Sequence, residues 1–121
     1  MSQYRQLLEH YIANPDWVLW AEAIIAVESR GNPYAVGDGS LALGVMQQHP
    51  DFQETYHPSG LGGSTWLRAN TEYQIECLID FWVRHVGCDI RGRMLIYHYG
   101  HLELEDPDNY WKKIQAAKPT S

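Results

Sequence analysis

The chain has 121 residues, of which 45% are hydrophobic and 20% are charged, a composition that indicates one globular domain over residues 1–121 and excludes a disordered chain. Its formal net charge is −6, with no block of Lys or Arg, which argues against nucleic acid or an anionic membrane as the main partner. No apolar run approaches the roughly 18 residues of a membrane span, and the N-terminus lacks the apolar stretch of a signal peptide.

Two helices are predicted at the start of the chain. Residues 3–13 carry apolar side chains at helical spacing, namely Tyr4, Leu7, Leu8, Tyr11 and Ile12. The run Asn14-Pro15-Asp16 ends this helix and caps a second one, which extends over about residues 16–30.

The second helix places a carboxylate on its apolar face. Glu28 lies within roughly 40° of Trp17 and Ile24 on a helical wheel, and Gly31 and Pro33 end the helix just beyond it. Because an ionised carboxylate is costly in such a place, we expect the pKa of Glu28 to be raised. A carboxylic acid that keeps its proton near neutral pH suits general acid catalysis, so Glu28 is the first candidate functional residue.

The rest of the chain reads as a glycine-rich segment followed by helices. Asp38-Gly39 suits a tight turn, which predicts a short β-like excursion within residues 31–48. A capping box at Thr71–Gln74 opens a long helix whose apolar stripe runs to Val86 and which stops at Gly87. Two more helices are predicted, one from Asp89 to Gly100 and one from Asp106-Pro107 to before Pro119. The predicted architecture is therefore mostly α.

Several motifs together resemble one family. Glu28-Ser29-Arg30-Gly31-Asn32-Pro33 resembles the Glu-Ser-x-x-Asn-Pro motif of the soluble lytic transglycosylases, in the lysozyme-like superfamily. Gly44-Val45-Met46-Gln47 resembles the Gly-x-Met-Gln motif of that family. Weaker matches follow in the same order at Pro50 and Phe52, at Gln74-Ile75, at Tyr97–Gly100 and at Tyr110. The resemblance covers roughly residues 17–114.

The resemblance implies a fold and an activity. The fold would be a lysozyme-like α+β domain with a small glycine-rich excursion after the catalytic helix. The activity would be cleavage of the β-1,4 bond between N-acetylmuramic acid and N-acetylglucosamine in peptidoglycan. Glu28 would protonate the glycosidic oxygen and then deprotonate the muramic C6 hydroxyl, which attacks the anomeric carbon and forms a 1,6-anhydro sugar. The substrate-binding residues would be Ser29, Gly44, Met46, Gln47, Tyr97 and His98. We also expect a monomer that holds no metal and no cofactor.

Position 98 departs from the family, which has Asn there. A neutral imidazole can donate or accept a hydrogen bond, so sugar binding can survive the change. A protonated His98 near Glu28 would lower the pKa of that carboxyl and weaken it as an acid. The other histidines show no metal-binding spacing.

Two alternatives stay open. A hydrolytic muramidase on the same fold would use a second carboxylate, for which Asp38, Asp51 and Glu54 are the candidates. A domain that binds glycan with little turnover is the other, and the net charge gives no attraction to an anionic cell wall. We expect synthesis in a cytoplasm and action at a cell wall, after delivery by a phage or after export. Cys77 and Cys88 are interpreted as free thiols without a role, and a bridge between them stays open as the alternative if Gly87 breaks the helix.

Overall fold

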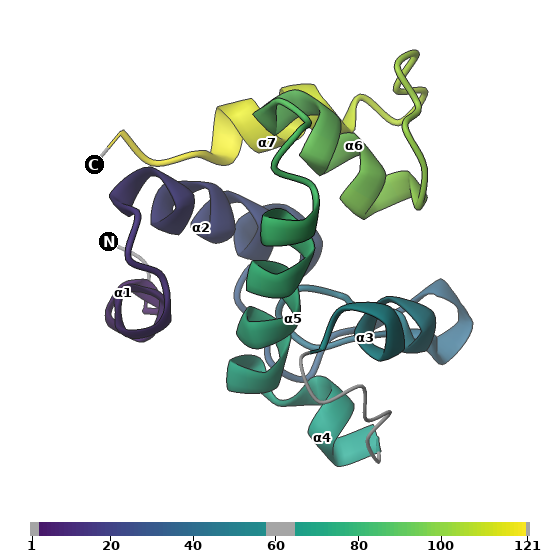
Figure 1. The fold of residues 1–121 in the computed structure, drawn as a ribbon. Coiled ribbons are helices and arrows are strands. Elements are labelled where there is room, and N and C mark those ends of the chain that lie inside the picture. Colours follow the sequence, from purple (N-terminus) through teal and green to yellow (C-terminus); the bar gives the residue numbers. More distant parts are fainter. Residues whose placement is uncertain (1–2, 58–64, 121) are drawn as a thin grey trace.

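The computed structural model describes residues 3–57 and 65–120, and this part of the chain is mostly helical (Figure 1). Its helices are α1 (Arg5–Tyr11), α2 (Pro15–Ser29), α3 (Pro50–Tyr56), α4 (Thr65–Ala69), α5 (Thr71–Arg84), α6 (Ile90–Tyr99) and α7 (Tyr110–Ala117). The strands β1 (Val36–Gly37) and β2 (Ala42–Leu43) pair antiparallel across a 3₁₀ turn, η1 (Asp38–Ser40). The mostly α prediction and the short β excursion after the second helix are both confirmed.

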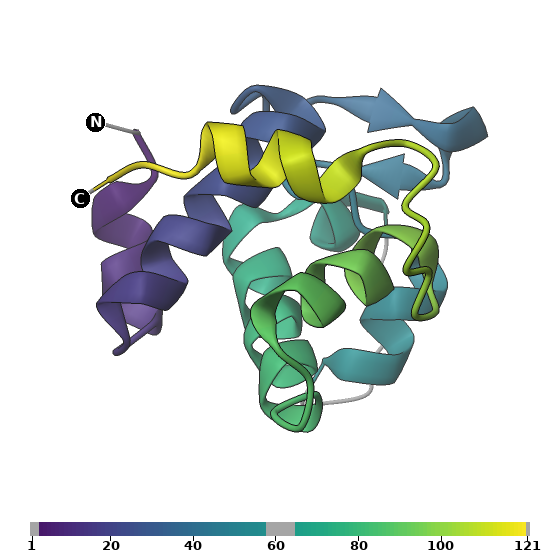
Figure 2. The same cartoon turned by 90° about the horizontal axis from the view of Figure 1, so that it is seen from above.

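Helix α5 lies at the centre of the fold (Figure 1), where α1, α3 and α4 pack against it. Helix α2 packs against α1 and α7, and α7 also packs against α6. Figure 2 shows α7 lying across α2, with the β hairpin at the edge of the molecule beside the C-terminal end of α2. The largest fully buried apolar side chains are Trp82, Phe81, Leu8, Ile24, Met46, Ile75, Leu78, Met94, Leu95 and Ile114.

The end of the predicted long helix differs from the prediction. Val83 and Val86 are 57% and 71% exposed, so the predicted buried stripe stops near Trp82. The helix itself ends at Arg84, before Gly87. At its start, the Asn70 side chain accepts a hydrogen bond from the Tyr73 backbone N–H. The cap is therefore Asn70, and the predicted capping box beginning at Thr71 is wrong by one residue.

The last helix also begins later than predicted. Helix α7 starts at Tyr110, and Asn109 before it has a left-handed backbone with φ of 54° and no capping side chain. The Asp106 carboxylate supplies the missing cap, because it accepts hydrogen bonds from the N–H groups of Tyr110 and Trp111 at 2.8 and 2.9 Å. Asp106-Pro107 therefore anchors the helix without being part of it. Helix α1 is likewise shorter than the predicted range 3–13.

Both cysteines are free thiols, with Cys77 buried and Cys88 partly exposed. Burial raises the pKa of the Cys77 thiol to about 12. Within the described residues, no helix is both long and apolar enough to cross a membrane.

Candidate active site

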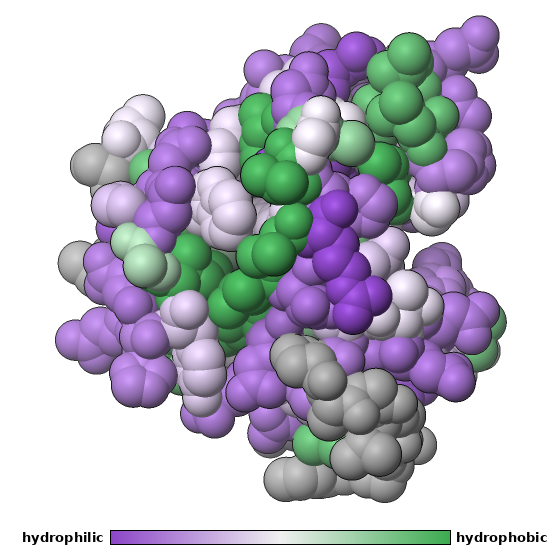
Figure 3. Space-filling view, viewed as in Figure 1, coloured by the Kyte–Doolittle hydropathy of each residue, from purple (hydrophilic) through white to green (hydrophobic). Residues whose placement is uncertain are grey.

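A cleft of about 540 Å³ opens between the β hairpin, α3 and α6. In Figure 3 the surface is hollowed at the right, between the end of α6 and α3. The lining residues are Glu28, Asp38, Ala42, Gln47, Gln48, His49, Asp51, Phe52, Thr55, Tyr56, Phe81, Ile96, Tyr97, His98, Tyr99 and Gly100. This lining combines carboxylates, imidazoles and amides with aromatic rings, a mixture that suits a polar ligand with flat apolar faces.

Glu28 lies in the last turn of α2 and reaches the cleft. The helix is started by Asn14, whose side chain accepts from the N–H groups of Asp16 and Trp17. It ends where Arg30 takes a left-handed backbone with φ of 55°, one residue before the expected stop at Gly31. These local signals fix where the helix carries its carboxylate along the chain.

The Glu28 carboxylate accepts a hydrogen bond of 2.7 Å from the hydroxyl of Tyr110, which is only 2% exposed. Burial raises the pKa of Glu28 above its ordinary value, while the Tyr110 hydrogen bond and the charge of a protonated His98 act to lower it. The pKa of Tyr110 is raised well above its ordinary value, mainly by burial. The Tyr110 hydroxyl therefore stays protonated and acts as the donor, and the second oxygen of Glu28 is left for another partner.

Ser29 does not line the cleft. Its hydroxyl donates to the backbone carbonyl of Val45 at 2.7 Å and accepts from the N–H of Gly31 at 3.1 Å. The bond to Val45 holds the end of α2 against the segment after β2. Ser29 thus holds Glu28 against the neighbouring segment, a role that the sequence alone did not indicate.

Gly44 and Met46 also lie behind the cleft wall. Gly44 has a left-handed backbone with φ of 78°, and a side chain there would meet the Gln74 amide at 2.7 Å. The buried Gln74 side chain accepts from the Met46 N–H at 3.0 Å and donates to the Leu43 carbonyl at 2.6 Å. Gly44 is therefore needed so that Gln74 can come close and fix the backbone around Met46.

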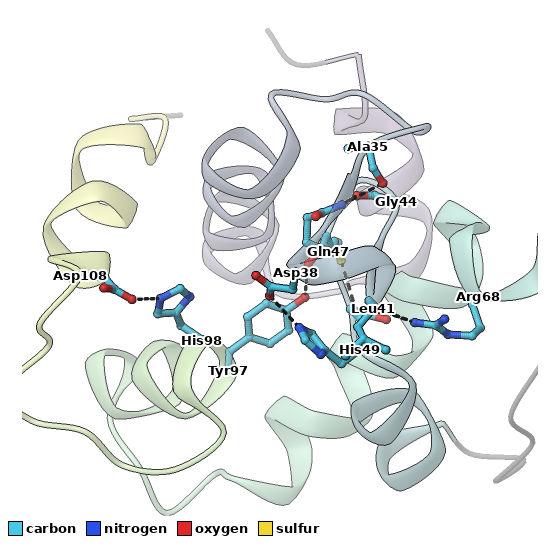
Figure 4. A network of polar contacts seen from close by, with 12 residues as sticks. Ala35, Asp38, Leu41, Gly44, Gln47, His49, Arg68, Tyr97, His98 and Asp108 are labelled. Carbon is cyan, nitrogen blue, oxygen red and sulfur yellow. Dashed lines mark hydrogen bonds and ion pairs between the residues drawn. The ribbon is translucent and has the colours of Figure 1, made fainter. Parts of the chain in front are cut away.

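Gln47 lines the cleft, and its side chain also bonds to the backbone on both sides of the β hairpin (Figure 4). Its side-chain amide donates to the carbonyls of Ala35 and Gly44 at 3.0 and 2.9 Å. The predicted presence of Gln47 in the groove is thus compatible with a second, structural function.

Tyr97 and His98 come from the last turn of α6 and both line the cleft. The Tyr97 hydroxyl donates to the Met46 carbonyl at 2.7 Å. The His98 ring stacks on the ring of Tyr110 with 4.1 Å between centroids and 6° between planes. Its Nε2 lies 2.8 Å from an oxygen of Asp108 (Figure 4). The direct polar partner of Glu28 is therefore Tyr110, with Tyr97 and His98 beside it.

Two of the three candidate second carboxylates line the same cleft as Glu28. Asp38 and Asp51 belong to the lining, whereas Glu54 does not. An oxygen of Asp38 lies 2.9 Å from Nε2 of His49 (Figure 4). The charges of Asp38 and His49 act on Glu28 in opposite directions, Asp38 raising its pKa and His49 lowering it. Asp38 is thus the second carboxylate that lies close enough to influence Glu28.

The sequence interpretation assigned no site role to Tyr110, His49 or Asp108. Tyr110 lies 82 positions after Glu28, so no local spacing joins the two. The signal that could have found Tyr110 is its match to the tyrosine of the closing helix in the resembled family. Nothing in the sequence pattern singles out Asp108 or His49.

No protein-family model, curated protein or solved structure matches the chain. Within residues 3–57 and 65–120, no group of three or more His, Cys, Asp or Glu side chains is arranged to hold a metal ion. What defines the site is a partly enclosed carboxylic acid, hydrogen-bonded to a buried tyrosine and facing a cleft with aromatic walls.

Proposed function

We propose that this protein is a lytic transglycosylase on a lysozyme-like fold, which cleaves peptidoglycan glycan strands between N-acetylmuramic acid and N-acetylglucosamine. The observation that carries the proposal is Glu28, whose pKa is raised by burial and whose carboxylate receives the Tyr110 hydroxyl in a cleft. A carboxyl group with a raised pKa keeps a proton at a pH where an ordinary glutamate has lost it.

In the proposed mechanism Glu28 performs both proton transfers. One oxygen of its carboxyl group is occupied by Tyr110, so the other carries the proton to the glycosidic oxygen as the bond to the anomeric carbon breaks. The carboxylate formed then takes the proton of the muramic C6 hydroxyl, whose oxygen bonds to the anomeric carbon. The product is a 1,6-anhydro sugar, and no water is consumed.

The walls of the cleft support binding of a sugar chain. Gln47 and Tyr97 lie in the lining and can meet polar substituents, while Phe52 and Tyr56 present aromatic surface. Ser29, Gly44 and Met46 would contribute by shaping the wall, through the backbone contacts described above. No Lys or Arg belongs to the described lining, so recognition would depend on hydrogen bonds and stacking. We propose that the enzyme acts as a monomer at the cell wall, whether a phage or the export machinery delivers it.

A second candidate function is hydrolysis of the same bond. It is favoured by Asp38, which lines the cleft with Glu28 and contacts His49. In that reaction Asp38 would take a proton from a water that attacks the anomeric carbon, while Glu28 protonates the leaving oxygen.

The deciding experiment is mass spectrometry of the products from purified peptidoglycan. The transglycosylase proposal predicts fragments that end in anhydro-muramic acid, and the hydrolase predicts only reducing ends that have gained water. The Glu28→Gln variant is expected to lose activity by about 10²-fold or more, with Glu9→Gln on the exposed face of α1 as the matched control. Equal activity of wild type and Glu28→Gln would remove Glu28 as the catalyst. A wild type that binds the glycan without cleaving it would favour the binding-module alternative.

A further inference from the structure

His98 is held on two sides by the protein. Its Nε2 lies 2.8 Å from the Asp108 carboxylate, and its ring lies flat on the Tyr110 ring at 4.1 Å. A third contact is edge-on, to the Tyr99 ring at 4.5 Å. Only 28% of the His98 side chain is exposed. Much of the imidazole is therefore committed to protein contacts, although the residue borders the cleft.

Tyr110 is held at its backbone by a separate contact. The Asp106 carboxylate accepts from the Tyr110 N–H at 2.8 Å, and it also receives the Tyr99 hydroxyl at 2.6 Å. This backbone bond fixes the position of the residue, and the core packs around its ring, which is only 2% exposed. The near-parallel stack with His98, at 6°, provides a flat contact on one face of the ring.

We propose that His98 and Asp108 are positioning residues, which together hold the Tyr110 ring so that its hydroxyl stays on the Glu28 carboxylate. Asp108 fixes the orientation of the imidazole, the imidazole fixes the tilt of the phenol, and the phenol fixes one oxygen of the acid. This inference rests on the proposed catalytic function of Glu28. It assigns to His98 an action through Tyr110, in place of the sugar contact that the family resemblance implies.

The charges around His98 give its removal a second effect, on the Glu28 carboxyl group. The groups that face it are Glu28 from α2, Tyr99 on its own helix, Tyr110 from α7, and Asp106 and Asp108 from the loop before α7. A protonated His98 lowers the pKa of Glu28. Removing the imidazole should therefore raise the pKa of Glu28 in two ways, because the charge is lost and because the Tyr110 hydrogen bond, which also lowers that pKa, is held less firmly.

The test compares four variants for kcat and KM on soluble peptidoglycan fragments. His98→Ala removes both the stack and the charge, and we expect kcat to fall about tenfold with KM within about twofold of the wild type. His98→Phe keeps a flat ring on Tyr110 and should recover most of that loss. Asp108→Asn, at a side chain that is 60% exposed, should reduce kcat without unfolding the protein. The matched control is His101→Ala, since His101 pairs with Glu103 nearby at 3.5 Å, and it should behave as wild type.

Three results would overturn the proposal. Wild-type kcat in both His98→Ala and Asp108→Asn would show that the pair positions nothing. A raised KM with unchanged kcat in His98→Ala would mean that His98 contacts the substrate. His98→Phe as impaired as His98→Ala, with both variants folded by circular dichroism, would exclude the stack as the means of action.

A second measurement separates this inference from the proposed function. NMR of a sample with labelled Glu and Tyr reports the titration of Glu28 and the ring signals of Tyr110 without any substrate. If the wild type cleaves no glycan, the proposed function fails, but the NMR comparison still decides the contact. We expect Tyr110 ring shifts to move in Asp108→Asn, and the pKa of Glu28 to rise in His98→Ala. Unchanged signals in both variants would refute the positioning function.

Discussion

Replacing Gly44 by alanine tests the support behind the cleft. Gly44 has φ of 78°, and an added Cβ would lie 2.7 Å from the side-chain nitrogen of Gln74. The left-handed backbone alone costs roughly 1–2 kcal/mol for a residue with a side chain. The clash then forces the buried Gln74 amide away from the Leu43 carbonyl and the Met46 N–H. Leaving such buried groups unpaired costs about 1–3 kcal/mol.

The two effects add to about 2–5 kcal/mol of lost stability, a large part of the roughly 5–15 kcal/mol that holds a typical domain folded. The assay is urea unfolding followed by circular dichroism, with the midpoint and slope fitted together. Because the Met46 carbonyl also receives the Tyr97 hydroxyl, activity is expected to fall in Gly44→Ala even where the protein is still folded.

Two other glycines provide matched controls. Gly39 has φ of 64°, but a Cβ added there would have no atom within 4 Å, so Gly39→Ala should lose only about 1–2 kcal/mol from backbone strain. Gly87 has neither feature, and Gly87→Ala should be close to neutral. Equal destabilisation in Gly44→Ala and Gly39→Ala would refute the clash with Gln74. A Gly44→Ala variant as stable as the wild type would refute the whole account of this support.

Three further predictions concern the acid, its partner and a helix cap. Tyr110→Phe removes the hydrogen bond that favours the ionised form of Glu28, so the pKa of Glu28 should rise. The alkaline limb of the pH–rate profile should then move to higher pH, and kcat should fall about tenfold. An alkaline limb at the wild-type pH would contradict this prediction. Glu28→Gln should melt at a higher temperature than the wild type at pH 8. A carboxyl group whose pKa is raised in the folded protein destabilises that folded state as the pH rises above the ordinary Glu pKa of 4.5. That advantage should vanish at pH 4, below the ordinary pKa, and the same advantage at both pH values would show that burial of the charge is not its cause. Asn70→Ala should lower stability by about 1 kcal/mol through loss of the bond from Tyr73, whereas Thr71→Ala should change it little; the reverse order in urea unfolding would restore the capping box.

Local patterns predicted much of the fold because helix formation depends on neighbours in the chain. Asn14 and Asp89 cap α2 and α6 as their positions indicate, and Gly100 ends α6 in the left-handed conformation. Local patterns failed to predict burial, because burial depends on which other elements cover a residue. Val83 and Val86 continue the apolar spacing of α5, but they lie at and beyond its end, where the core no longer covers them.

The site divides in the same way. The sequence by itself determined that Glu28 comes at the end of an apolar helix, that a glycine-rich turn follows it, and that the motif residues come in a particular order, because each of these properties is local. Only the tertiary structure decided what Glu28 faces. Its partner Tyr110 comes from a helix 82 positions away. Asp38 and His49 line the same cleft as Glu28, and Ser29 instead donates to the Val45 carbonyl. Such contacts depend on how the helices pack around α5, and no periodicity in the chain encodes that.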